Sequence, residues 1–138
     1  MCVMAKSWSE KLHNSKSPEI APSVRIVDGR PVGTAMLIPT PSQVKEYIEQ
    51  IPKGQTRSMK ALRADLAAAN GAEITCPLCA GIFVRIVAEA ALEESRNGKS
   101  LESVTPFWRV LEPDSPAAKK IPDGTKLISE LRAAEAIA

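Results

Sequence analysis

Two cysteines are spaced so that they could do covalent chemistry. Cys76 and Cys79 are separated by Pro77 and Leu78 in a chain of 138 residues. Such a pair can exchange disulfides, and the positive end of a helix dipole would favour its thiolate form. A tetrahedral zinc site needs two further ligands, and the only histidine, His13, lies in a polar N-terminal stretch. We therefore place a structural role first for this pair, a redox switch second and a metal site third.

A second candidate site is the run Pro106, Phe107, Trp108 and Arg109, which sets two aromatic rings beside an arginine. Aromatic rings stack on nucleobases, and this is worth about 1 to 3 kcal/mol per base in proteins that bind single strands. The alternative is structural: side chains alternate along a strand, so one ring would enter the core while the other is half covered. We favour the core for Phe107 and leave Trp108 open between the two roles.

Composition excludes several classes of protein. The formal net charge is +2 and the pI is about 8.5, which permits a polyanionic partner without requiring one. Three cysteines, Cys2 among them, cannot all pair, and neither an apolar leader nor a membrane span is recognisable, so we expect a cytoplasmic protein. The sequence holds no Gly-x-Gly-x-x-Gly or Walker loop, and a single histidine makes a Ser/His/Asp set improbable. We expect neither a cofactor nor a metal.

The elements that must position these residues follow from turns and periodicity. Residues 1–40 are rich in Ser, Pro and Lys, which predicts an N-terminal arm, partly extended or disordered, with an extended patch at Val24 to Val27. Residues 41–138 predict a folded domain. Capping residues and apolar spacing of three and four indicate three successive helices, at Ser42 to Ile51, Ser58 to Ala69 and Thr75 to Arg96.

The C-terminal part predicts a different order of elements. Val104 to Leu111 is typical of a strand, Glu112 to Asp123 of a wing-like loop with three prolines, and Thr125 to Ile137 of a last helix. The predicted fold class is therefore mainly α with a small β element: a winged helix-turn-helix-like domain with an extended N-terminal arm.

Three motifs resemble a known family. These are Ile51-Pro52-Lys53-Gly54-Gln55-Thr56-Arg57-Ser58, Pro106-x-x-Arg109-Val110 and Leu131-x-x-x-Glu135, spaced around the long third helix. Over about Pro41 to Ala136 the chain resembles the DNA-binding domain of the alkylguanine-DNA alkyltransferases, which carry Pro-Cys-His-Arg-Val. Phe107 stands where the family has its acceptor cysteine and Trp108 where it has histidine. A phenyl ring cannot accept an alkyl group by thiolate attack, so the resemblance implies a noncatalytic, alkyltransferase-like member.

The resemblance also implies a partner and contact residues. The implied partner is duplex DNA, alkylated or otherwise damaged and bound without repair, with other repair proteins as further partners. Pro106, Phe107, Trp108 and Arg109 would form a vestigial base pocket, and the counterpart of Arg109 helps to fix the active-site loop, with Glu135 as a candidate partner. The expected DNA contacts are Lys53, Arg57, Ser58, Lys60, Gly81 and Arg85.

Two positions differ from the family. Met59 stands where the enzymes have a tyrosine, and Gly81 where they have the arginine that fills the gap of a flipped base, with Arg85 one turn later. Two alternatives to DNA binding remain open: a thiol redox protein that uses Cys76 and Cys79, and a protein-interaction module on the same scaffold. The sequence does not indicate an oligomeric state.

Overall fold

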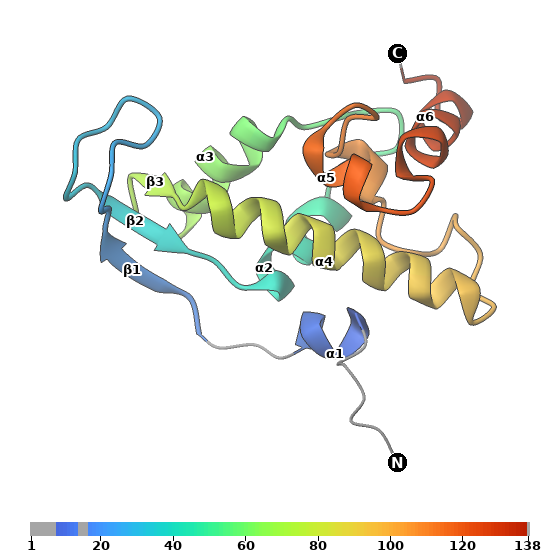
Figure 1. The fold of residues 1–138 in the computed structure, drawn as a ribbon, viewed down its shortest axis with the longest axis horizontal. Coiled ribbons are helices and arrows are strands. Elements are labelled where there is room, and N and C mark those ends of the chain that lie inside the picture. Colours follow the sequence, from blue (N-terminus) through green and yellow to red (C-terminus); the bar gives the residue numbers. More distant parts are fainter. Residues whose placement is uncertain (1–7, 14–16, 138) are drawn as a thin grey trace.

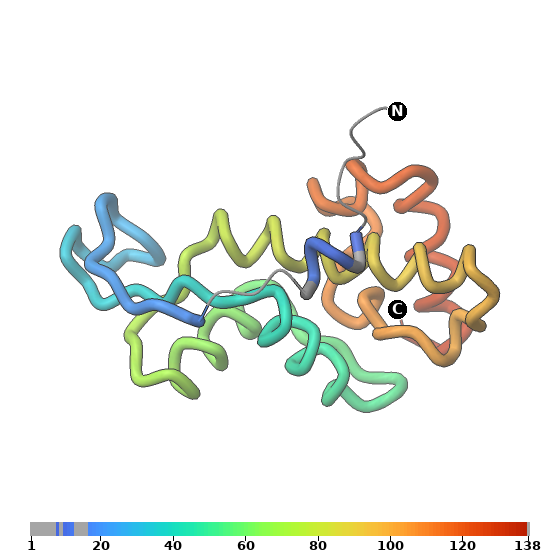
Figure 2. Tube along the Cα trace, turned by 90° about the horizontal axis from the view of Figure 1, so that it is seen from below, coloured from blue at the N-terminus to red at the C-terminus, as the bar shows by residue number. Residues whose placement is uncertain are grey.

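The long helix α4 (Pro77–Arg96) is the axis of the molecule (Figure 1). The computed structural model describes residues 8–13 and 17–137. Within them, helices dominate and a three-stranded sheet is the only sheet, which confirms a mainly α fold with a small β element. The sheet lies at one end of the molecule and α6 (Gly124–Ala134) near the other (Figure 2). Small residues of α4, Ala80, Ala88 and Ala91 among them, are buried and let neighbouring elements pack closely.

Capping residues explain where the helices begin. Ser58 caps α3 (Met59–Ala69) by accepting the backbone N–H of Ala61, as predicted. The predicted cap of α2 (Pro41–Glu49), Ser42, was wrong because Thr40 is the cap. The Thr40 hydroxyl accepts the N–H of Gln43, and the Gln43 side chain accepts the N–H of Thr40 in return. Helix α2 has proline at its first position and begins at Pro41, one residue before the predicted start at Ser42. Helix α4 also begins with a proline, Pro77, two residues after the predicted start at Thr75.

The expected N-terminal arm supplies two strands and a helix. Strand β1 (Glu19–Pro22) pairs antiparallel with β2 (Ala35–Ile38), and β2 pairs in parallel with the two-residue β3 (Ile74–Thr75). The patch Val24 to Val27 is not a strand but part of the connection between β1 and β2, closed by a Val27–Arg30 bridge. Helix α1 (Trp8–His13) packs against α4 with Leu12 buried (Figure 2).

The predicted strand Val104 to Leu111 is wrong. A 3-10 turn, η1 (Phe107–Arg109), occupies its centre, and the carbonyl of Phe107 accepts the N–H groups of Val110 and Leu111. Pro106 removes one donor that a strand ladder would need. A turn, unlike a strand, lets both neighbouring rings enter the core. The rings of Phe107 and Trp108 pack edge to face, with their centroids 5.3 Å apart.

The expected wing-like loop contains a helix. Ser115 caps α5 (Pro116–Lys120), which leads through a tight turn into α6. Asp123 adopts a left-handed conformation with φ of 57°, and Gly124 approaches Ala118 so closely that a side chain there would overlap the Ala118 carbonyl oxygen. Glycine is therefore required at position 124.

We predict opposite effects for two glycine-to-alanine changes. Gly124→Ala should lower the free energy of unfolding by about 1 to 3 kcal/mol because the new methyl group overlaps backbone. Gly81→Ala lies inside α4 with open space around the new methyl group, so it should raise stability by about 0.5 to 1 kcal/mol. Urea unfolding of both variants and of the parent measures this, and a stabilised Gly124→Ala protein would contradict the packing of α5 on α6.

Candidate functional site

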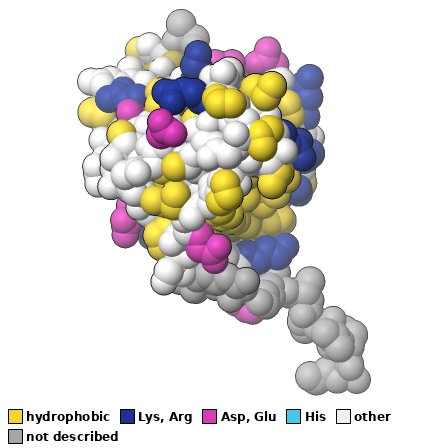
Figure 3. All heavy atoms as spheres, turned by 90° about the vertical axis from the view of Figure 1, so that its left-hand side faces the viewer, with side chains coloured by type: hydrophobic (Ala, Val, Ile, Leu, Met, Phe, Trp, Pro, Cys, Tyr) yellow, Lys and Arg dark blue, Asp and Glu magenta, His cyan; other side chains and the backbone are white. Residues whose placement is uncertain are grey.

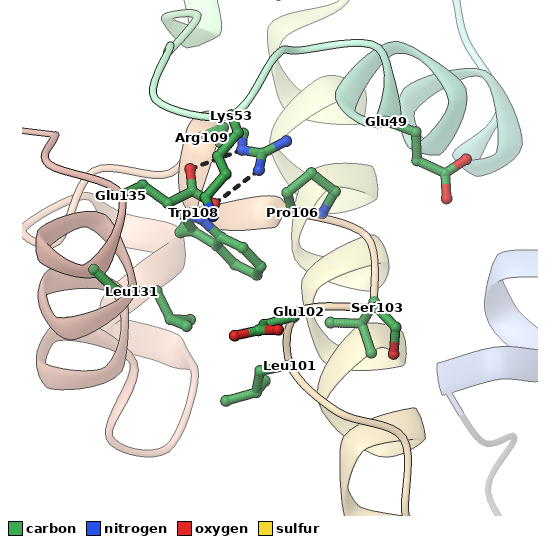
Figure 4. Close-up of a pocket in the computed structure, with 12 residues that line it drawn as sticks. Glu49, Lys53, Leu101, Glu102, Ser103, Pro106, Trp108, Arg109, Leu131 and Glu135 are labelled. Atoms are coloured by element: carbon green, nitrogen blue, oxygen red, sulfur yellow. Dashed lines mark hydrogen bonds and ion pairs between the residues drawn. The ribbon is translucent and has the colours of Figure 1, made fainter.

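A largely buried ion pair, Arg109 with Glu135, joins three segments that are far apart in the chain. Arg109 donates from Nε to Glu135 at 2.9 Å, from Nη2 to Glu135 at 2.7 Å and from Nη1 to the carbonyl of Ile51 at 2.8 Å (Figure 4). The two side chains are only 14% and 8% exposed. Bidentate geometry and the third bond satisfy most of the guanidinium donors, which a buried pair requires.

The same pair holds the segment between α2 and α3. The carbonyl of Arg109 accepts the N–H of Arg57 at 2.9 Å, and the Glu135 carboxylate accepts the N–H of Gly54 at 3.3 Å. The hydrogen bonds from Arg109 hold the pKa of Glu135 at about 2, well below its usual range, although burial acts in the opposite direction. Segments 51–57, 107–109 and the end of α6 therefore form one unit.

A cavity of about 650 Å³ opens beside this unit (Figure 4). Its apolar wall includes Leu101, Pro106, Trp108 and Leu131, and its rim carries charged residues of both signs: Glu49, Lys53, Glu102, Arg109 and Glu135. The Glu102 carboxylate extends below the Trp108 ring towards α6 (Figure 4). Mixed charge at the rim makes the cavity a poor match for a single type of ion.

The two aromatic residues contribute unequally. Phe107 is 0% exposed and lines no cavity that the structure shows, so it belongs to the core. Trp108 is 3% exposed and presents only part of its ring to the cavity. Its indole N–H lies near Glu135 but meets no acceptor at hydrogen-bond geometry. A base could stack on Trp108 only if the loop 101–106 or α6 moved.

A second hollow of about 400 Å³ lies along the first two turns of α4. Its lining includes Leu78 and Ile82, which are 71% and 48% exposed, and the half-buried Trp8 of α1. The charged residues that line it are all cations: Lys11, Arg85 and Lys120. We call this hollow the α4 groove. No carboxylate belongs to its lining in the described part of the chain.

Arg85 is only partly available at this groove. Its guanidinium lies 3.4 Å from the carboxylate of Glu89, one turn along α4, and 5.3 Å from the Trp8 ring. The Lys11 ammonium nitrogen lies 4.1 Å from the centroid of the same ring. One cation is thus partly neutralised while Lys11 and Lys120 form no ion pair within residues 8–13 and 17–137.

The structure divides the predicted contact residues between the two hollows. Lys53, Pro106, Trp108 and Arg109 line the cavity, whereas Gly81 and Arg85 line the α4 groove, and no residue lines both. Ser58 caps α3 and is exposed, as is Lys60 on its first turn. Sequence patterns missed Trp8, Leu78 and Ile82, although an apolar stripe too wide for one buried face was a usable signal for the last two.

The cysteine pair lies at the start of α4. Cys76 is the N-cap, and its sulfur accepts the N–H of Cys79 at 3.4 Å. Burial, and then the hydrogen bond to Cys76, raise the pKa of Cys79 to about 11, so the expected lowering by the helix dipole is wrong for this thiol. Within the described residues no three side chains of His, Cys, Asp or Glu gather as metal ligands, and Cys2 lies outside them.

Comparison with known proteins identifies no relative: no family model, no curated protein and no solved structure matches the chain. Across residues 8–13 and 17–137, none of the helices has the length and apolarity needed to cross a bilayer.

We predict that the Arg109–Glu135 pair makes stability depend on pH. The pKa of Glu135 is lowered from 4.5 to about 2 on folding, so the pair stabilises the fold fully above pH 4.5 and loses this effect as pH falls towards 2. Glu135→Gln should therefore cost about 3 kcal/mol at pH 7 and clearly less near pH 3. Urea unfolding at both pH values tests this.

Glu130→Gln is the matched control for that experiment. Glu130 lies on α6 as well, is exposed and forms no ion pair within the described residues, so its loss should change stability little at either pH. A Glu135→Gln penalty that is the same at pH 7 and pH 3 would contradict the assignment.

Proposed function

We propose that this protein is a non-enzymatic DNA-binding protein that contacts duplex DNA through α3 and α4. The observation that carries the proposal is the α4 groove, where exposed apolar side chains of α4 stand among three cations and no carboxylate. Positive charge without a lining carboxylate suits a polyanion, because each neutralised phosphate releases counterions.

The arrangement of the two helices supports the same conclusion. Helix α3 ends at Ala69, residues 70–76 form a turn and the short strand β3, and α4 begins at Pro77, so two successive helices follow each other as in a helix-turn-helix unit, with a longer connection (Figure 1). Ser58 and Lys60 lie exposed at the start of α3, where helix N-terminal N–H groups favour a phosphate. In this proposal α3 positions the protein on the backbone and α4 enters a groove, with the loop around α5 in the place of a wing.

The side chains at the start of α4 indicate how such DNA would be recognised. Leu78, Gly81 and Ile82 carry no hydrogen-bond donor or acceptor that could read the edge of a base. They could fill a groove or press between base steps, as apolar residues do in proteins that bind without strong sequence preference. We therefore propose binding that depends on phosphate charge and DNA shape more than on sequence.

Membership of the alkyltransferase-like class is part of the proposal. Its support is spatial: Arg109 of the second motif bonds to Ile51 of the first and to Glu135 of the third. In this proposal alkylated or otherwise damaged duplexes are preferred, and Phe107 at the acceptor position makes repair by alkyl transfer impossible. The cavity at Pro106 and Trp108 is the place where an altered base would be sensed.

A protein partner is the second candidate, and one observation favours it. Leu78 and Ile82 lie one turn apart and are exposed, which is the spacing that an amphipathic helix of another protein can cover. Cations around an apolar pair would select an acidic helix. The two candidates differ in their response to DNA.

We predict measurable and salt-dependent affinity for a short duplex. Fluorescence anisotropy with an unmodified duplex and with one alkylated guanine, each at low and moderate salt, is the test. Lys120→Ala should weaken binding several-fold and lower the slope of log affinity against log salt by about one, whereas Arg85→Ala should have a smaller effect because Glu89 partly neutralises that guanidinium. Tighter binding to the alkylated duplex would support lesion sensing.

Lys99→Ala is the matched control. Lys99 follows the C-terminal end of α4 and pairs with Glu94 at 2.9 Å, away from the groove. If it weakens binding as much as Lys120→Ala, the attraction is not specific to the groove. Absence of binding to both duplexes at low salt would overturn the proposal and move a protein partner to the front.

A further inference from the structure

We infer that Cys76 and Cys79 form a reversible disulfide at the first turn of α4, by exchange with a small-molecule disulfide such as glutathione disulfide. The two thiols are free in the structure, so the reduced form is the one described. The inference is independent of DNA binding and rests on the geometry of this turn.

The backbone holds Cys76 in a fixed place. Its N–H donates to the carbonyl of Leu37 at 2.9 Å, which ties it to the end of β2, and β3 precedes it directly. As N-cap it has φ of −55° and ψ of 115°, which lie outside the helical region and turn its side chain back over the first turn. Its sulfur therefore reaches the N–H of Cys79 at 3.4 Å. The first sulfur thus already contacts the backbone of the second cysteine within one helical turn, which is the arrangement from which we infer that a disulfide forms.

The two thiols have different roles in the exchange. The N–H of Cys79 donates to the Cys76 sulfur at 3.4 Å, which holds that sulfur over the first turn of α4. Cys79 keeps its proton, because burial and its side-chain hydrogen bond with Cys76 raise its pKa to about 11. Both side chains are half-buried and not sealed from solvent. Cys76 is thus the attacking thiol and Cys79 the resolving thiol.

The exchange balances as two successive displacements. The Cys76 thiolate attacks one sulfur of glutathione disulfide, that S–S bond breaks, and one glutathione leaves as its thiolate and takes up a proton. Cys79 then loses its proton and attacks the Cys76 sulfur of the mixed disulfide, which releases the second glutathione. The protein loses two electrons and two protons, and one glutathione disulfide becomes two glutathiones.

Two other uses of the pair have less support. A metal needs more ligands, and within the described part of the chain no cluster of three candidate side chains exists. A purely structural role needs only the single capping bond from Cys79 to Cys76, which serine would supply equally well. A second thiol in resolving position is what distinguishes a redox pair.

Oxidation would act on the α4 groove directly. Pro77 and Leu78 lie between the two cysteines and line the groove, so a disulfide would replace the capping hydrogen bond and fix their positions. The redox state of the pair would in this way set the shape of the exposed start of α4.

The test uses the full chain in glutathione buffers from strongly reducing to strongly oxidising. Samples are quenched in acid, free thiols are alkylated, and the tryptic peptide of residues 64–85, which contains both cysteines, is weighed. In reducing buffer we expect both cysteines of this peptide to carry the alkyl label. In oxidising buffer we expect neither to carry it, and the peptide mass should be that of the unlabelled dithiol form less two hydrogen atoms. Reduction should restore the labelled form. The variant Cys2→Ser, which removes the third thiol, should behave as the parent does.

Two variants assign the roles. Cys79→Ser should accumulate the mixed disulfide at Cys76 because no resolving thiol remains, while Cys76→Ser should form little of either product and keep its helix cap. Alkylation of reduced Cys79 should be at least tenfold slower than that of Cys76 at neutral pH and should accelerate as pH rises towards 11, as its raised pKa requires.

Several results would overturn the inference. In the most oxidising buffer, a parent protein that has no internal disulfide would overturn the inference, whether it stays reduced or carries glutathione on either cysteine. A bridge that forms only in denaturant would do so as well. DNA affinity of the reduced protein is measured separately, so loss of this inference leaves the proposed function standing, and loss of DNA binding leaves the disulfide standing.

Discussion

The fold depends on satisfying the hydrogen-bond donors of one largely buried guanidinium group. Arg109 sits in a short turn, and a guanidinium that is 14% exposed destabilises a protein unless its donors are satisfied. Glu135 at the end of α6 and the carbonyl of Ile51 at the end of α2 satisfy three of them. Because these two partners come from parts of the chain that are distant from Arg109 and from each other, the requirement of one side chain determines where the connection before α3 and the C-terminal helix must lie. The backbone bonds of Gly54 and Arg57 then follow from that position.

The region around Arg109 is tightly packed, whereas the outer side of the first turns of α4 is exposed to solvent. Around Arg109, both aromatic residues and the ends of α2 and α6 pack tightly, and the cavity there exposes little of Trp108. At the start of α4, Ala80 and Val84 are buried in the core, whereas the outer side is lined only by residues of α1, α4 and α5, and Leu78 remains largely exposed. Ile20 of β1 and Val24 and Val32 of the β1–β2 connection are also exposed. The end of the molecule seen in Figure 3 carries apolar side chains interspersed with both basic and acidic ones. Of the two hollows, the α4 groove is therefore the one that presents exposed side chains without any rearrangement.

Local signals predicted the helices, and non-local contacts explain what they missed. Ser58 marks a helix start through a bond within one turn, and Pro77 marks one through its fixed φ, so local sequence located both helices to within one or two residues. Strands β1 and β2 depend on pairing between segments some fifteen residues apart and on the distant β3, which no local pattern encodes. The run from Val104 to Leu111 has the composition of a strand, but it has no partner edge and its rings are needed in the core. Of the site, the Arg109–Glu135 contact was anticipated through the resemblance, whereas the α4 groove depends on α1 and could not be.

Charge and shape at the groove constrain which partner it can hold. Arg85 is partly neutralised by Glu89, which is 5% exposed and would be costly to leave alone, so this arginine cannot swing freely to a ligand. Lys11 and Lys120 flank the groove from α1 and α5, and phosphates at two separate places would engage them better than one compact anion would. Between them the apolar pair Leu78 and Ile82 needs a surface that is itself apolar, such as the stacked interior of a groove or the face of a helix. The combination of two separated cations and a central apolar pair fits an extended partner, and Cys76 and Cys79 lie at the one turn whose stiffness would change that fit.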